Sequence, residues 1–223
     1  MISSKLTQYT LLFTLFSVEL FGQKIPLTTN TLMVSNVTLE QAAYHNRKAI
    51  RITGTSAGEK VALVKNFEFK NGIIELEVAG KPLPDTDPSF RGFIGIAFRL
   101  RHTDSLRYEC FYIRPTNGRA EDQLRRNHST QYISHPQHTW QKLRRESPGV
   151  YESYTDLIAG EWTKLKIIVN DKDARLYVND SDQPCLIVTQ LKGEVTTGSI
   201  ALWIGIGTDG YFRNLKVTKT KSG

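Results

Sequence analysis

The sequence predicts an all-β protein in which two antiparallel sheets pack face to face as a jelly-roll sandwich. Apolar and polar residues alternate along most of the 223 residues, which is the pattern of strands with one buried face. Helical periodicity is hard to find outside one basic segment. No repeat, low-complexity tract or second composition divides the chain. The turns separate roughly eleven strands, a number that suits two packed sheets.

The alternation is clearest where a charged or polar residue is followed by an apolar residue at each position. In 72–80, Ile73, Glu75 and Glu77 alternate with apolar residues, directly after an Asn71-Gly72 pair that signals a turn. The proline- and aspartate-rich residues 81–89 indicate a loop. Further strands are expected at 48–54, 59–69, 90–101, 105–115 and 150–156, three within 161–188 and two within 198–220.

The first 23 residues are expected to be a removable bacterial export signal. Lys5 supplies positive charge, residues 9–21 form a short apolar core, and Gly22 is the small residue near the cut. Glu19 interrupts the apolar run, which is also too short for a membrane span. The alternative is a buried first strand or helix. Removal of the signal leaves one domain, 24–223, outside the cytoplasm, and about 200 residues suffice for one core.

The net charge limits the classes of binding partner, and the cysteine content limits the number of disulfides. The formal net charge of +7 suits nucleic acid, an anionic surface or an acidic polysaccharide. Export, and the lack of a nucleic-acid-binding motif, argue against nucleic acid. Cys110 and Cys185 are the only cysteines and permit one disulfide, but Cys110 lies in an apolar strand pattern and is expected to be a buried free thiol.

Two C-terminal stretches carry a family resemblance. "GEWTKLKIIVNDKDARLYVND" (160–180) and "GSIALWIGIGTDGYFRNLKV" (198–217) resemble the closing half of concanavalin A-like, laminin-G-like jelly rolls. The chain over 45–220 is most similar to bacterial secreted domains grouped with 3-keto-disaccharide hydrolases. The resemblance implies a sandwich whose concave sheet binds glycan, and it places Trp162 and Trp203 in the core. The fold itself hosts lectins, hydrolases, lyases and adhesion modules.

The strands 90–101 and 105–115 are expected to form a hairpin that carries part of the binding face. Arg99 lies on the polar face of the first strand, and Tyr112 and Arg114 share one face of the second. The alternative is that these arginines only solvate an outer sheet face. The core face of the first strand is expected to be Ile94, Ile96, Phe98 and Leu100.

Residues 114–149 interrupt the strand pattern with a basic segment. It holds three of the five histidines, and helical turns are expected within 121–128 and 137–149 around a strand at 129–136. Trp140 and Leu143, three residues apart, would pack inward. A disordered loop would not need these apolar residues, so we expect an ordered excursion over one end of the sandwich.

The composition of this segment suits anionic sugars. Arginine binds carboxylate or sulfate in a planar, bidentate way, and His and Tyr can move protons. His128 and Tyr132 are therefore the candidate catalytic residues, for β-elimination of a uronate. The candidate substrate-binding residues are Arg99, Tyr112, Arg114, Asn117, Arg119, Arg126, His135 and Trp140.

Hydrolysis and metal chemistry have weaker support. A glycosidase needs two carboxylates about 5–10 Å apart, and the candidates are few: Glu75 with Glu77, Glu109, Glu121 and Asp122. His128, His135 and His138 lack a zinc-site spacing. Residues 84–89 and 179–182 offer oxygen ligands but are typical of turns. No metal or cofactor is predicted, and Ca²⁺ stays open without a motif.

Three functions remain at this stage. The first is a secreted protein that binds a neutral or anionic glycan on an Arg/Tyr/His-lined face. The second is a glycoside hydrolase or polysaccharide lyase that uses the same face. The third is a non-catalytic adhesion module that binds protein. The sequence leaves the sugar, the redox state of the cysteines and the oligomeric state open.

Overall fold

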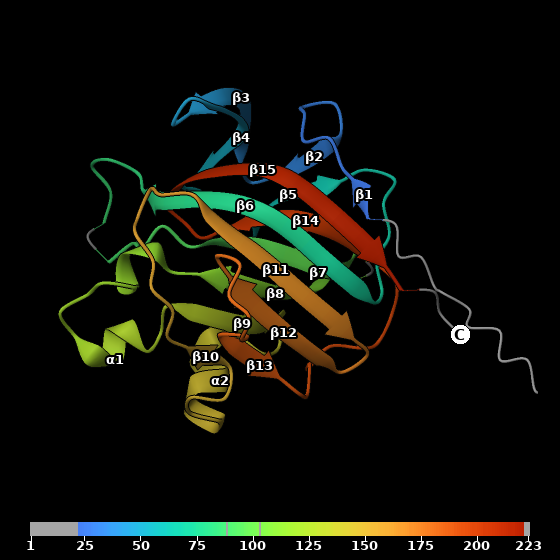
Figure 1. Ribbon diagram of the computed structural model, residues 1–223. Helices are drawn as coiled ribbons and strands as arrows, with labels where there is room; N and C mark the ends of the chain where they lie inside the picture. Colours follow the sequence, from blue (N-terminus) through green and yellow to red (C-terminus); the bar gives the residue numbers. More distant parts are fainter. Residues whose placement is uncertain (1–21, 88, 103, 221–223) are drawn as a thin grey trace, which may run out of the picture.

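The computed structural model describes residues 22–87, 89–102 and 104–220, which form two antiparallel sheets packed face to face (Figure 1). This confirms the predicted β-sandwich. Residues 1–21 of the expected export signal lie outside the described residues. No helix among the described residues is long and apolar enough to cross a membrane.

One sheet, sheet A, faces the viewer in Figure 1. It contains β1 (Gln23–Lys24), β3 (Thr38–Tyr44), β4 (Arg47–Gly54), β6 (Gly72–Pro82), β11 (Thr163–Asn170), β12 (Asp173–Val178), β13 (Leu186–Val188) and β15 (Thr208–Lys219). Among the described residues its order is β13-β12-β11-β6-β15-β4-β3, with β1 paired to β15.

The second sheet, sheet B, lies behind it. It contains β2 (Leu32–Ser35), β5 (Lys60–Val64), β7 (Ile94–His102), β8 (Leu106–Ile113), β9 (Thr130–His135), β10 (Glu152–Ser153) and β14 (Ser199–Ile204). Its order over the described ranges is β10-β9-β8-β7-β14-β5-β2. The expected β7–β8 hairpin is therefore present at the centre of this sheet.

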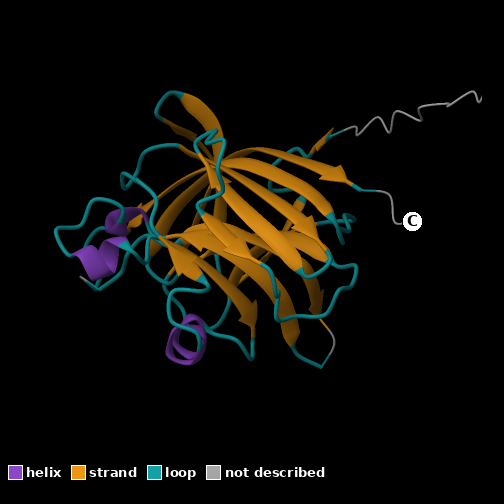
Figure 2. Ribbon diagram, turned by 60° about the horizontal axis from the view of Figure 1, so that its bottom comes forward, coloured by secondary structure: helices purple, strands orange, loops and turns teal. Residues whose placement is uncertain are grey.

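The basic segment is ordered, as predicted. A short 3-10 helix (Pro115–Asn117) leads to α1 (Gln123–Arg126), and α2 (Trp140–Glu146) follows β9. The side chain of Asp122 caps α1 by accepting from the backbone N of Arg125 at 2.9 Å. Leu143 of α2 is buried and Trp140 packs against the core. Figure 2 shows the helices together on the side of the sandwich away from the C-terminus.

The apolar residues of both sheets meet between the layers. Ile94, Ile96 and Phe98 lie on the core face of β7, as predicted; Leu100 is also buried, but it follows the bulge after Phe98 and pairs with Ser199 on the other face. Phe98 stacks on Phe111 of β8 with ring centroids 6.3 Å apart. Sheet A supplies Ile74, Leu76, Val78, Ile167 and Phe212 to the same cluster. Burial of this apolar area is the main contribution to stability.

Three predictions need correction. Strands β1 to β3 were missed because β3 is exposed on most of both faces, which removes the alternation that marks a strand. Trp162 does not join the main core; it lies in a separate cluster on the outer side of sheet A, with Tyr44 and Tyr211. Arg99 and Arg114 do not solvate an outer face, because both are buried. Cys110 is a buried free thiol, as expected, and Cys185 is also free.

Candidate functional site

A row of polar and aromatic residues crosses the outer face of sheet B, which is the face turned away from sheet A. Strand register places Glu152 opposite Gln131, Gln131 opposite Tyr112, Tyr112 opposite Gly95, and Gly95 opposite Trp203. Alternation puts these residues on one face, since Phe111 and Ile113 beside Tyr112 point into the core. We call these five residues the site row.

Gly95 is the one position of the site row without a side chain. A Cβ at this position would overlap the carbonyl oxygen of Phe111 and lie 2.6 Å from Cα of Tyr112. The missing side chain lets Tyr112 and Trp203 lean toward each other across it, with ring centroids 4.8 Å apart. The glycine therefore determines how closely β7 and β8 approach and where Tyr112 lies.

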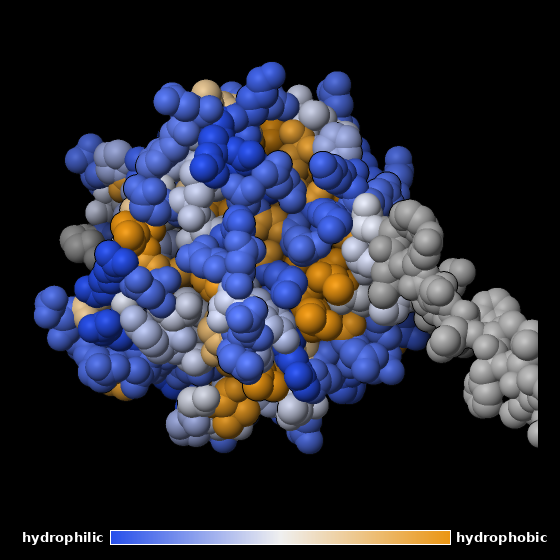
Figure 3. Space-filling view, viewed as in Figure 1, coloured by the Kyte–Doolittle hydropathy of each residue, from blue (hydrophilic) through white to orange (hydrophobic). Residues whose placement is uncertain are grey.

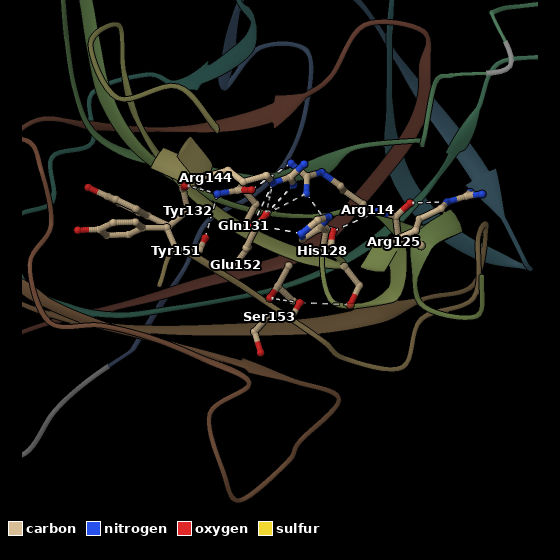
Figure 4. A network of polar contacts seen from close by, with 12 residues as sticks. Arg114, Arg125, His128, Gln131, Tyr132, Arg144, Tyr151, Glu152 and Ser153 are labelled. Atoms are coloured by element: carbon tan, nitrogen blue, oxygen red, sulfur yellow. Dashed lines mark hydrogen bonds and ion pairs between the residues drawn. The ribbon is translucent and has the colours of Figure 1, made fainter. Parts of the chain in front are cut away.

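Arg114 extends the row beyond the end of β8 and is held by its own neighbours. Its Nη2 donates to the hydroxyl of Tyr112 at 2.9 Å and to Oε1 of Gln131 at 3.1 Å. Its Nη1 donates to the backbone oxygen of His128 at 3.0 Å. Figure 4 shows Arg114, Gln131 and His128 close together. Held by three hydrogen bonds and 3% exposed, Arg114 orders the site and is too enclosed to be its outer surface.

Glu152 is the single carboxylate on which three basic groups converge. Arg144 of α2 binds it bidentately, with Nε to Oε1 at 2.9 Å and Nη2 to Oε2 at 2.6 Å. Nε2 of His128 lies 3.2 Å from Oε1, and Nη1 of Arg114 lies 3.9 Å from Oε2. The carboxylate is only 4% exposed. Two guanidinium groups against one carboxylate leave a local excess of positive charge.

The outer rim of this cluster is formed by Trp140, His128 and Arg144. The Trp140 ring lies 4.8 Å from the guanidinium carbon of Arg144 and 5.5 Å from that of Arg114. Trp140 and His128 are partly exposed, and the Arg144 side chain is 31% exposed. A ligand at this rim would meet an aromatic face and two basic groups at the same time.

Burial changes the acid–base behaviour of the site. It lowers the pKa of His128; Glu152 opposes this shift, while Arg144 and Arg114 add to it. Burial also raises the pKa of Tyr112, against the influence of Arg114. His128 is therefore biased toward neutral imidazole, which can accept or donate a hydrogen bond to a ligand.

This shift predicts a pH dependence of stability. Because the pKa of His128 is lower in the folded chain than the unfolded value of about 6.5, the unfolded chain takes up the proton first as pH falls. The contribution of His128 is complete above about pH 6.5 and is lost below it. We expect the urea midpoint of unfolding to decrease as the pH is lowered from about 7 to about 5. This decrease should be smaller in His128→Gln. The control is His45→Gln, at an exposed ring; an identical pH profile for His128→Gln and the parent would contradict the prediction.

A second polar group adjoins the Trp203 end of the site row. The hydroxyl of Tyr108 donates to Glu59, and Nε1 of Trp203 donates to the Tyr108 hydroxyl at 3.1 Å. The His135 ring stacks on Tyr108 at 4.9 Å, and its Nδ1 lies 3.5 Å from Oε1 of Glu59. Burial raises the pKa of Tyr108 and lowers that of His135. Here Glu59 is the accessible carboxylate, with 33% of its side chain exposed.

The structure brings together only some of the residues singled out in the sequence. Tyr112, Arg114, His128 and Trp140 meet at the site row and its rim, and His135 lies in the neighbouring group with Tyr108. Tyr132 points the opposite way: its hydroxyl donates to buried Glu109 on the core side of sheet B. His128 and Tyr132 therefore do not face a common substrate position, and the geometry does not support a β-elimination that uses both.

The other four candidates have separate positions. Arg99 follows a β-bulge in β7 with φ +52°, and its side chain leaves the outer face. Asn117 donates to the backbone oxygen of His128 at 3.1 Å, which orders the turn before β9. Arg119 pairs with Asp156 at the surface, and Arg126 donates to the hydroxyl of Tyr154.

Sequence reasoning missed several members of the site. Trp203 was assigned to the core, which its burial confirms, but it was not recognised as a site residue. Gln131 was placed on a strand face without a role. Glu152 and Arg144 carry no motif, because they meet only after α2 folds back over β9 and β10. Alternation supplied one usable signal, since Gln131 and His135 share a face of the expected strand 129–136.

A wide groove lies on the opposite side of the molecule, on the outer face of sheet A. Its volume is about 1010 Å³, and it passes Lys24–Leu27, the charged residues of β6 and β11, and Tyr177. Figure 3 views this face and shows hydrophobic residues in the centre of a hydrophilic surface. Glu75 and Glu77, which do share one face as predicted, are paired with Lys216 at 3.2 Å and Arg47 at 3.3 Å. A smaller pocket of about 400 Å³ adjoins the groove at Trp162.

The residues that could ligate a metal ion do not come together among the described residues. Across 22–87, 89–102 and 104–220, no three His, Cys, Asp or Glu side chains are grouped as metal ligands. His128 contacts Glu152, whereas His135 stacks on Tyr108. In the turns that offered oxygen ligands, Asp87 accepts from the backbone N of Ser89, and Asn179 accepts from that of Lys164.

Comparisons with known proteins identify the fold. No family model and no curated protein matches the sequence. Among solved structures, the carbohydrate binding module CBM66 from Bacillus subtilis is 14% identical with a TM-score of 0.57, over 84% of this chain and 96% of that one. A Bacillus subtilis protein of unknown function with a galectin-like fold is 12% identical (TM-score 0.53, covering 85% and 90%).

A third similar structure was solved with a bound oligosaccharide. The exoplasmic/lumenal domain of VIP36, in its Ca²⁺/Man3GlcNAc-bound form, is 10% identical with a TM-score of 0.52, over 88% of this chain and 86% of that one. At identities this low, structural similarity establishes the architecture alone. The function has to be argued from the site. The shared architecture shows that this chain has the jelly-roll β-sandwich fold that the sequence predicted, the fold of galectin-like proteins.

Proposed function

We propose that the protein binds carbohydrate on the outer face of sheet B, at the rim formed by Trp140, His128 and Arg144. The observation that carries this proposal is the excess positive charge around Glu152 directly beside a partly exposed tryptophan ring. Sugar rings present apolar C–H faces that pack on aromatic rings, and arginine binds carboxylate or sulfate groups bidentately. The predicted ligand is therefore a glycan that carries an anionic group.

The two halves of the rim have different tasks in this proposal. Trp140 supplies the packing surface for a sugar ring, and Arg144 with His128 faces the anionic group. Arg114, Gln131 and Tyr112 lie beneath and keep the rim in place, because their hydrogen bonds are directed at each other and at the backbone. The similar folds of a carbohydrate binding module and of the Man3GlcNAc-bound VIP36 domain add support.

The proposed cellular location agrees with the proposed glycan ligand. The leader-like first 23 residues favour export to the periplasm or beyond, where extracellular glycans are met. A protein-binding adhesion role and a catalytic role remain the competing functions. For catalysis, His128 and Glu152 are the titratable pair at the rim, and Glu59 is the second carboxylate on the same sheet face.

The groove on sheet A is a second candidate for the glycan. Its volume of about 1010 Å³ is large enough for several sugar units, and the smaller pocket that adjoins it is lined by Trp162, which packs with Tyr44 and Tyr211. Tyr44 and Tyr211 stack with centroids 3.8 Å apart. The surrounding charges are mostly paired with each other, so this face favours a neutral oligosaccharide.

The test is a binding and product assay on residues 24–223 with acidic and neutral polysaccharides. We expect binding of an acidic glycan without new reducing ends and without the absorbance of unsaturated uronates. Trp140→Ala should weaken that binding about tenfold, the scale of one lost aromatic contact. Trp162→Ala is the matched control on the other sheet and should leave it unchanged.

Each other result identifies a different function. Weaker binding in Trp162→Ala, with Trp140→Ala unaffected, would move the glycan to sheet A. Reducing ends would indicate a hydrolase, and unsaturated uronates a lyase. Neither binding nor products from any polysaccharide would overturn the carbohydrate proposal and favour a protein partner.

A further inference from the structure

A small basic cavity lies at the end of sheet B, apart from the rim of Trp140. It has a volume of about 150 Å³ and lies between the ends of β7, β8 and β9 and residues 192–196. Three arginines and a lysine line it: Arg99, Arg101, Arg107 and Lys192. Such a volume is below the range of about 300–1,000 Å³ that is typical of drug-sized ligands, so a compact group is the fitting occupant.

Two guanidinium nitrogens in this cavity wall are unpaired. Arg99 is 3% exposed, and its Nε and Nη2 donate to the backbone oxygens of Lys70 at 2.9 Å and Asp171 at 2.8 Å. Its Nη1 has no hydrogen-bond partner among the described residues, and neither does Nε of Arg101. A buried charged donor without an acceptor is costly, so two in one cavity wall point to an acceptor that comes from a ligand.

The carboxylates nearby do not neutralise these cations. Both oxygens of Glu109 are already engaged, one by the hydroxyl of Tyr132 and one by the backbone N of Gly193 at 2.7 Å. Burial raises the pKa of Glu109, against the hydrogen bonds from Tyr132 and Gly193 and the charge of Arg99. Glu194 reaches Nη2 of Arg101 at 2.6 Å, but its side chain is 73% exposed. Four basic side chains thus face two carboxylates in the cavity wall, and a third carboxylate, the exposed Asp104, lies 3.9 Å from Arg107 outside it.

We propose that this cavity binds a compact tetrahedral oxyanion, sulfate or phosphate, through Nη1 of Arg99 and Nε of Arg101. Arg107 adds positive charge at the cavity edge, and Lys192, whose Nζ lies over the Tyr151 ring, adds charge nearby; Ser134 and Thr196 also line the cavity. The anion is either a free inorganic ion or the ester group of a sulfated sugar whose ring stays outside the cavity. This site is independent of the proposed glycan rim, since it uses none of the rim's residues.

The experiment is calorimetric titration of residues 24–223 with sodium sulfate, sodium phosphate and a monosaccharide 6-sulfate at constant ionic strength. We expect Arg101→Gln and Arg107→Gln to weaken binding about tenfold each, the scale of one charge-assisted hydrogen bond. Both side chains are about one-third exposed, so these variants retain the fold. Glu194→Gln should strengthen binding, because it releases Arg101.

The controls repeat the charge changes outside the cavity. Arg145→Gln and Glu146→Gln alter the exposed pair on α2 and should leave affinity within about twofold, the size of a screened long-range effect. Binding of the sugar sulfate as strongly as the inorganic ions supports an ester group, and binding of the inorganic ions alone supports a free anion. No binding of either ion, or equal weakening by Arg101→Gln and Arg145→Gln, overturns the proposal. Trp140→Ala should keep sulfate binding, which separates this result from the glycan test.

Discussion

Glu152→Ala is expected to lower the free energy of unfolding by about 3–5 kcal/mol, the cost of leaving a buried charge without its partner. The carboxylate is 4% exposed and lies within 4 Å of Arg114, Arg144 and His128. Its removal leaves the guanidinium groups of Arg114 and Arg144 without their shared carboxylate. Urea denaturation at pH 7 measures the change.

Two comparisons show whether charge is the reason. Glu152→Gln keeps the shape and an acceptor oxygen but not the charge, so it should fall between the parent and Glu152→Ala. Asp156→Ala removes an exposed carboxylate paired with Arg119 and should cost less than about 1 kcal/mol, as surface pairs do. A loss in Glu152→Ala no greater than that in Asp156→Ala would show that the cluster is not a buried ion network.

Gly95→Ala is expected to cost about 3 kcal/mol, at the upper end for overpacking by one methyl group. The added carbon would meet the backbone of Phe111 and Tyr112, and backbone gives way less readily than the end of a side chain. The strand β8 must shift, and Tyr112 and Arg114 shift with it. We therefore expect a lower urea midpoint, an altered Trp203 fluorescence and weaker glycan binding together.

The control is Ala97→Gly, two residues along the same face of the same strand. Ala97 is fully buried, and its replacement should cost about 1 kcal/mol through backbone entropy and lost packing. If Gly95→Ala is as stable as the parent, the close approach of β7 and β8 at this glycine is not required, and the geometric basis of the site row is lost.

Local patterns in the sequence were sufficient for much of the fold. Alternation predicted the core face of β7 from Ile94 to Phe98, and the i, i+3 pair of Trp140 and Leu143 predicted α2. Both patterns depend only on side-chain direction within one element. Strand β3 was missed for the same reason, because an exposed edge strand shows no apolar period.

The candidate site was only partly predictable, and Arg99 shows why. Strict alternation places Arg99 beside Tyr112 and Arg114, but the bulge after Phe98 turns it to the end of the sandwich. Tyr132 was paired with His128 by proximity in the sequence, whereas strand register turns it to the core side. A one-residue change in register or a single bulge moves a side chain to the opposite face.

The sequence by itself determined the class of fold, the central strands, the ordered basic segment and the type of chemistry that Arg, His and Tyr could provide. Only the tertiary structure decided that Glu152 joins Arg114, Arg144 and His128, that Gly95 shapes the site row, and that Arg99 lines a separate basic cavity. The reason is physical. Periodicity acts within a strand or helix, whereas these groups meet across strands far apart in the chain, and their positions depend on register and on how α2 packs over sheet B.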